Sequence, residues 1–190
     1  ASGGTSRPET GATGDGFGWL ATLGHTVVPN NYSLVPVRCS DSWVPLIAGV
    51  TLRDVKMTLF ADAKKHSAHV GKILFTHVGL SGPTILNLSK SIGDMLQHST
   101  VTITVNLLPE FDAGALKVKL RELFSLSSNK MVKNALIELL PSAIVPPLLY
   151  LAAIDGDTPC HSVRTAERTL LAQLIAAIPL HVTGLQGADK

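Results

Sequence analysis

The stretch that most constrains the fold is Lys72–Lys90, KILFTHVGLSGPTILNLSK. Its first part predicts an apolar strand, and its last part repeats apolar residues at helical spacing. Between them, Ser81 stands where a helix N-cap is expected, and Pro83 falls in the first helical turn, where a missing N–H costs nothing. Such a glycine-rich turn at a helix N-terminus can hold an anion or a polarised oxygen. Residue chemistry alone favours the simpler interpretation, a capped strand–helix junction without a ligand.

Short strands separated by turn residues dominate residues 30–110. The clearest is Val101–Asn106, where apolar residues alternate with threonine and asparagine, the period-two pattern of a half-buried strand. Weaker strand patterns occur at His25–Val28, Leu34–Val37, Val50–Phe60 and Ala68–Phe75, with a short helical turn at Trp43–Ala48. Pro36 predicts an edge position for its strand. Several short strands at close spacing favour a small β-barrel or a curled sheet.

Residues 111–180 change to helical patterns. The expected helices are Ala113–Phe124, Lys130–Leu140, Ser142–Ile154 and Arg164–Ile178, with a short strand at His181–Thr183. Ser142 is the expected N-cap of its helix. The fold class expected from these patterns is α+β, a small β-barrel followed by a helical subdomain.

Composition narrows the classes of function. A net charge of +2, without a run of Lys or Arg among aromatic residues, speaks against a nucleic-acid partner. Two cysteines make no disulfide framework, which predicts a reducing, cytoplasmic location. The apolar run Ala135–Ile154 contains Glu138 and three prolines, so no membrane span is expected. The glycine-rich start without Met, and an end without a closing element, predict a chain cut from a longer protein.

The candidate chemical motifs are all incomplete. Asp62, His66 and His69 lie in a stretch that favours a solvated strand or loop over a metal site. The order His77, Ser81 lacks the GxSxG elbow of a serine hydrolase, although His77 can still act as a proton donor.

Two further motifs favour structural roles. The glycines around Asp15 match neither a P-loop nor the GxGxxG fingerprint, and Asp15 before a helix is more often an N-cap than a ligand. Arg164, Glu167 and Arg168 favour a solvated helix face.

Several motifs together resemble the BaiN/YhiN-like flavoprotein family of NAD(P)/FAD-dependent oxidoreductases. The most specific is LFTHxGxSGP at Leu74–Pro83. The supporting segments are Ala1–Gly4, Ser6-x-Pro8, Thr10–Gly16, Leu23–His25, Ser33–Pro36, Ala48–Leu52, Leu107–Pro109 and Thr183-Gly184. Two family segments are absent: the dinucleotide-binding fingerprint expected before the first motif and a GGYN-type segment expected after the last.

The resemblance implies that the barrel and helices are inserted into a dinucleotide-binding (FAD) domain that is largely missing here. Residues 1–29 would be a remnant of that domain, 30–110 the barrel-like part, 111–180 the helical part and 181–190 a return strand. The implied flavin-side residues are Gly3, Gly4, Thr10, Gly11, Thr13, Gly14, Asp15 and Gly16. The implied substrate-side residues are His77, Gly79, Ser81 and Gly82, with His77 the one catalytic candidate and no metal ligands.

The expected function is that of a substrate-side region, which caps the flavin and shapes a pocket for a small molecule. The expected cofactors of the whole protein are FAD and, as reductant, NAD(P)H. The partner of this region would be the remainder of the FAD domain, and the region alone is expected neither to catalyse nor to retain FAD. The alternative is a binding or scaffolding module with a barrel similar to those of translation factors.

Overall fold

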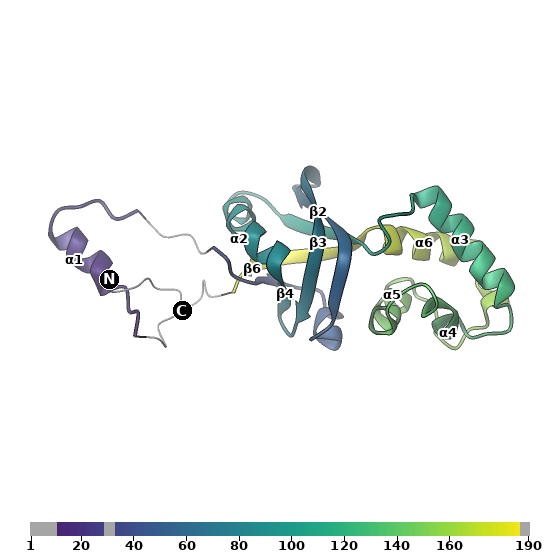
Figure 1. Cartoon of the computed structure of the whole chain (residues 1–190). Coiled ribbons are helices and arrows are strands. Elements are labelled where there is room, and N and C mark those ends of the chain that lie inside the picture. Colours follow the sequence, from purple (N-terminus) through teal and green to yellow (C-terminus); the bar gives the residue numbers. More distant parts are fainter. Residues whose placement is uncertain (1–10, 29–32, 187–190) are drawn as a thin grey trace.

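The structure is a computed structural model that describes residues 11–28 and 33–186 (Figure 1). The helices are α1 (Asp15–Thr22), α2 (Pro83–Leu96), α3 (Ala113–Leu126), α4 (Val132–Leu136), α5 (Val145–Leu151) and α6 (Thr165–Ala176), with the 3-10 helices η2 (Val44–Ile47), η3 (Ser142–Ile144) and η4 (Cys160–Ser162). The strands are β1 (Val37–Cys39), β2 (Thr51–Ala61), β3 (Lys64–Thr76), β4 (Gly79–Ser81), β5 (Val101–Asn106) and β6 (Ile178–Leu185).

The six strands form a closed antiparallel barrel in the order β1-β4-β3-β2-β5-β6, which confirms the predicted barrel and the α+β class. Two expectations for its first strand are wrong. The strand begins after Pro36, at Val37, and it is not an edge, because β1 pairs with β4 on one side and β6 on the other. Closure of the barrel leaves no unpaired edge for the proline to occupy.

The imperfect alternation along β2 has a local cause. Leu52, Val55, Met57 and Leu59 are buried, but the pairing with β3 shifts register between Leu52 and Val55. Asp54 lies within that shift in a left-handed conformation, with φ 54°. The irregularity places one extra residue between the inward-facing Leu52 and Val55, as a β-bulge does.

The strand from Lys72 does lead through a turn into a helix, but the cap differs by one residue. Ser81 ends β4, and the N-cap of α2 is Gly82, with φ 99°. Pro83 is the first helical residue, as predicted. The positive φ at the N-cap explains the glycine, because it lies where a side chain is strained.

The helical part differs from expectation mainly in the lengths of its helices. α3 and α6 fall where predicted. The third expected helix is split into η3 and α5. Ser142 is the first residue of η3, and the N-cap position is occupied by Pro141. The expected short strand at His181–Thr183 is part of the longer β6, which pairs with β1 and β5. His25–Val28 forms no strand.

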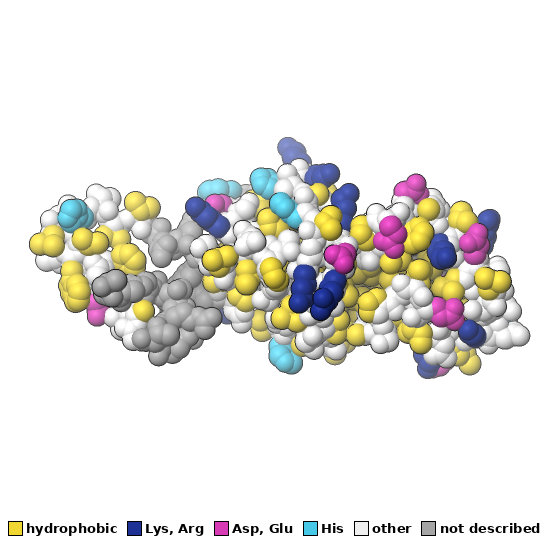
Figure 2. All heavy atoms as spheres, viewed as in Figure 1, with side chains coloured by type: hydrophobic (Ala, Val, Ile, Leu, Met, Phe, Trp, Pro, Cys, Tyr) yellow, Lys and Arg dark blue, Asp and Glu magenta, His cyan; other side chains and the backbone are white. Residues whose placement is uncertain are grey.

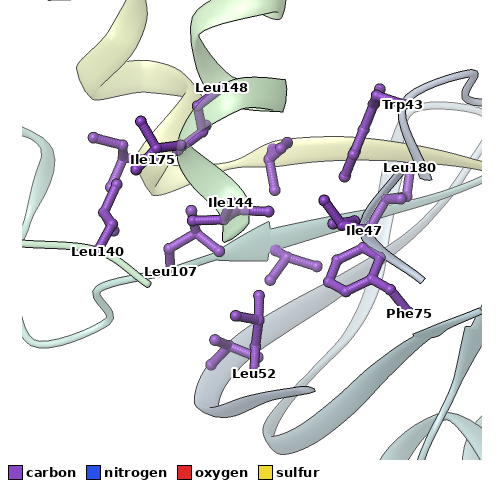
Figure 3. Close-up of a cluster of buried hydrophobic side chains, with 14 of the residues drawn as sticks. Trp43, Ile47, Leu52, Phe75, Leu107, Leu140, Ile144, Leu148, Ile175 and Leu180 are labelled. Atoms are coloured by element: carbon purple, nitrogen blue, oxygen red, sulfur yellow. The ribbon is translucent and has the colours of Figure 1, made fainter. Parts of the chain in front are cut away.

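Barrel and helices share one continuous apolar core (Figure 3). From the helical part, Ile144 and Leu148 are fully buried in it, and from the barrel side Trp43 and Phe75 contribute rings whose centroids lie 5.8 Å apart. Burying these side chains stabilises the fold by about 2 kcal/mol each. The helical part is therefore packed onto the barrel and not merely tethered to it.

Candidate functional site

The LFTHxGxSGP stretch builds the tight turn between β3 and β4. Thr76 begins the turn, and its Oγ1 accepts a hydrogen bond from the backbone N–H of Gly79 at 3.1 Å. The carbonyl of Val78 accepts one from the N–H of Cys39 at 2.9 Å. His77 is exposed on this turn, so its imidazole is available to solvent or to a ligand.

Gly79 is required by the closeness of β4 and β1. A Cβ atom at Gly79 would lie 2.1 Å from the carbonyl oxygen of Val37 and 2.9 Å from the Cα of Arg38. Both are backbone atoms and cannot rotate away. This glycine of the motif therefore has a packing role in the barrel.

Ser81 and Gly82 lie at the other end of β4 from His77. A Cβ atom at Gly82 would be 3.1 Å from both the N–H nitrogen of Leu74 and the carbonyl oxygen of Lys72, so this glycine also allows a close backbone approach. With a rise of about 3.3 Å per residue, β4 separates His77 from Ser81 by roughly 10 Å. The four substrate-side candidates thus lie in β4 or directly beside its ends, but the structure does not gather them at one point.

The described part of the N-terminal loop precedes α1. Its N-cap is Gly14, with φ 80°, and not Asp15, which is the first helical residue. The Asp15 carboxylate accepts a hydrogen bond from Thr13 Oγ1 at 2.7 Å, and a Cβ at Gly11 would meet nothing within 4 Å. A carboxylate at this helix end would repel a pyrophosphate, so it suits a hydroxyl group better than a phosphate. Gly3, Gly4 and Thr10 lie outside the described residues.

A polar contact that sequence reasoning missed joins β6 to the loop after β1. The carboxylate of Asp41 accepts hydrogen bonds from the backbone N–H of His181 at 2.7 Å and lies 2.9 Å from its Nδ1. The two residues are 140 positions apart, so no local pattern could reveal their contact.

Burial, helped by the nearby Asp41 charge, raises the pKa of the Cys39 thiol to about 12. Cys39 is therefore protonated and is no nucleophile at neutral pH.

An apolar hollow of about 450 Å³ lies between η2 and α5. Trp43 and Ile47 line it from the barrel side, and Pro147 and Tyr150 line it from the helical side. The sequence predicted the short helical turn at Trp43–Ala48 that lines this hollow, but nothing in that turn indicated a binding site. The hollow suits an apolar or ring-shaped group.

His66 and His69 lie on β3 and not on a helix. Within residues 11–28 and 33–186, no group of three or more His, Cys, Asp or Glu side chains is placed to hold a metal ion. In the same residues, no helix has the length and apolar character needed to cross a membrane.

Residues 32–190 match the family described as HI0933-like protein barrel and H2TH domain. Two relatives, from Haemophilus influenzae and Escherichia coli, are both named ribosomal RNA dihydrouridine synthase. They are 31% identical to the chain over 76% and 98% of its length, and these alignments cover 33% and 44% of the two relatives. A third relative, the 3-dehydro-bile acid delta(4,6)-reductase of Clostridium scindens, is 23% identical over the whole chain and 46% of its own length.

The chain thus spans less than half the length of the curated relatives it matches. Two of these relatives have an RNA in their names. The expectation that a nucleic-acid partner is excluded, which rested on the small net charge, is therefore not supported.

Proposed function

The chain belongs to the family of HI0933-like proteins with a barrel and an H2TH domain, and on this premise we propose that it is the substrate-side region of a flavin-dependent oxidoreductase. The observation that carries the proposal is the match over residues 32–190 together with the names of the relatives, a synthase of dihydrouridine and a reductase. Both names describe the addition of hydrogen to a carbon–carbon double bond.

The two ends of the barrel segment support insertion into a host domain. Val37 at the start of β1 pairs directly with Leu185 at the end of β6. A segment whose entry and exit lie side by side can be inserted into another domain without distorting it. The helical part joins the barrel at the opposite end of β6, at Ile178, roughly 25 Å away by the rise of a strand.

The exposed helix α1 supports a contact with the remainder of an FAD domain. None of its side chains is buried, although Trp19 and Leu20 are exposed by 63% and 45% and Leu23, directly after it, by 76%. Figure 2 shows hydrophobic side chains at this end of the molecule. Such an exposed apolar patch is typical of an interface.

In the proposed reaction, a flavin held by the host domain would supply hydride chemistry, with NAD(P)H as its reductant. One carbon of the double bond takes the hydride, and the other takes a proton. Ser81 lies next to Leu80, which pairs with Val37, so Ser81 and Gly82 lie near the host side and are the proposed substrate contacts. His77 is exposed at the far end of β4, roughly 10 Å from Ser81, too far to protonate the carbon next to the one that takes the hydride, so we propose it as a contact to a more distant part of the substrate.

The proposed substrate is a uridine of ribosomal RNA in the cytoplasm, as the names of the two 31%-identical relatives indicate. A second candidate is a small apolar molecule with a conjugated double bond. The observation that favours it is the apolar hollow between η2 and α5, together with the name of the bile-acid relative.

The absorbance spectrum of the complete gene product, purified beside the 190-residue chain, tests the proposal. We expect flavin bands in the complete product and none in the chain, because the host domain would supply most of the cofactor contacts. Incubating the complete product with NAD(P)H and either ribosomal RNA or a conjugated steroid then separates the two substrates. A complete product without flavin would overturn the proposal.

A further inference from the structure

We propose that a basic hollow between α3 and α6 binds the phosphodiester backbone of RNA. The inference rests on the proposed function for the kind of substrate and on the hollow itself for the site. The hollow has a volume of about 180 Å³. Its lining residues are Lys117, Val118, Arg121, Thr165, Arg168 and Thr169.

Three of these lining side chains are cationic, and none is acidic. Lys117 and Arg121 are one helical turn apart on α3, and Arg168 lies on α6, which packs against α3. Among the described residues, none of the three forms an ion pair, whereas Lys130 and Lys133 of the same helical part are paired with Glu138 and Asp157. Three unpaired cations around one hollow repel one another, and a bound anion relieves that repulsion.

The first two turns of α6 add donors to the same hollow. Thr165 and Thr169 contribute hydroxyl groups, and the helix N-terminus is the positive end of its dipole. The nearby carboxylate of Glu167 is already engaged, since it accepts hydrogen bonds from the backbone N–H and the Nε of Arg164, each at 2.8 Å. Glu167 is therefore tied to Arg164 and leaves the three cations without a carboxylate partner.

The size and place of the hollow indicate a phosphate of a large molecule. It has room for a phosphate group and opens to solvent, where Lys117, Arg121 and Thr165 are exposed. It lies on the helical part, which joins β6 at the end farthest from the proposed flavin side. A small substrate held at the flavin cannot span that distance, whereas an RNA strand can.

Fluorescence anisotropy of a labelled, uridine-containing RNA oligonucleotide, measured with the complete gene product at several salt concentrations, tests the proposal. We expect Arg121→Gln and Arg168→Gln each to weaken binding by roughly tenfold and to lower the salt slope by about 1. Lys119→Gln is the matched control, because Lys119 is an exposed cation on α3 outside the hollow. It should leave both quantities near those of the parent protein, and Arg121→Lys should restore most of the affinity.

Three results would overturn the proposal: no salt-dependent RNA binding, unchanged binding in both arginine variants, or an equal loss in Lys119→Gln. An NADPH titration adds a fourth, since an NADPH affinity lost in the same arginine variants would assign the hollow to the dinucleotide.

The flavin spectrum is measured separately on every variant. A normal spectrum with unaltered RNA binding rejects the hollow and leaves the proposed oxidoreductase standing, whereas a product without flavin rejects the oxidoreductase alone.

Discussion

At the scale of single residues, backbone closeness explains the glycines of the most specific motif better than ligand contact does. Gly79 and Gly82 are both placed where a Cβ atom would press on backbone atoms of neighbouring strands. Their occurrence in the motif could be recognised from the sequence, but their reason could not, because the atoms they approach belong to residues as far away as Val37. His77 is different, since nothing in the barrel requires an exposed imidazole at its position.

Gly79→Ala should destabilise the fold by about 3 kcal/mol, because the new methyl group would collide with the carbonyl oxygen of Val37. Gly184→Ala is the matched control. Gly79 and Gly184 pair with Arg38 from its two sides, but a Cβ at Gly184 meets nothing within 4 Å. Chemical denaturation of both variants measures the effect. Equal losses would show that the close approach of β4 to β1 is not what demands glycine.

Cys39 should make the stability depend on pH in the alkaline range. Burial raises its pKa from 9.0 to about 12, so the folded state holds a proton that the unfolded state releases above pH 9. The stabilisation is complete below pH 9 and is lost as pH rises toward 12, at about 1.4 kcal/mol per pH unit. Comparing the urea unfolding of the parent chain and Cys39→Ala at about pH 8 and pH 10 isolates this effect. Parallel losses in the two proteins would contradict it.

At the scale of elements, the sequence predicted best where a pattern is local. The alternation in β5 and the helical spacing in α3 and α6 identified those elements close to their actual bounds. Prediction from the sequence failed where contacts between distant residues determine the structure. The bulge in β2, the two-sided pairing of β1 and the full length of β6 all depend on strands distant in sequence.

The candidate site follows the same division. The turn that carries His77 and the helix that begins at Pro83 could be predicted, since both lie within one continuous stretch. The basic hollow could not, because Lys117 and Arg168 meet only through the packing of α3 on α6. Arg164, Glu167 and Arg168 were expected only to form a solvated helix face; the structure pairs Arg164 with Glu167 and places Arg168 in the lining of the hollow.

The turn between β2 and β3 should be improved by glycine. Its two residues, Asp62 and Ala63, have φ values of 47° and 63°, which makes it a left-handed hairpin turn. Ala63→Gly should therefore raise the free energy of unfolding by about 0.5 to 1 kcal/mol. Ala68→Gly, on the extended and exposed part of β3, should lower it by a similar amount. If both variants are destabilised alike in urea, the turn is not strained by alanine.

At the scale of the whole molecule, the stability resides in the barrel and the helical part that share the core. Residues 11–28 add no buried side chain to it. The family match begins at residue 32, close to the start of the barrel segment. The N-terminal segment is thus better explained by a partner surface than by a contribution to this core.

A chain that begins at Ser33 should accordingly unfold at the same temperature as the 190-residue chain, within about 2 °C. Differential scanning calorimetry on the two proteins measures it. The same truncation should raise solubility, because it removes the exposed Trp19 and Leu23. A large drop in the midpoint would mean that α1 packs on the barrel in solution.

The pairing of Val37 with Leu185 has a mechanical consequence. A host domain would hold the barrel through two adjacent strands, so the barrel could rotate as one lever about that point. The helical part lies about 25 Å along that lever, and a tilt of about 10° at the pivot carries it through roughly 4 Å. A change of contact at the far end of the molecule would then cause a small rotation at the end where the flavin is proposed to lie.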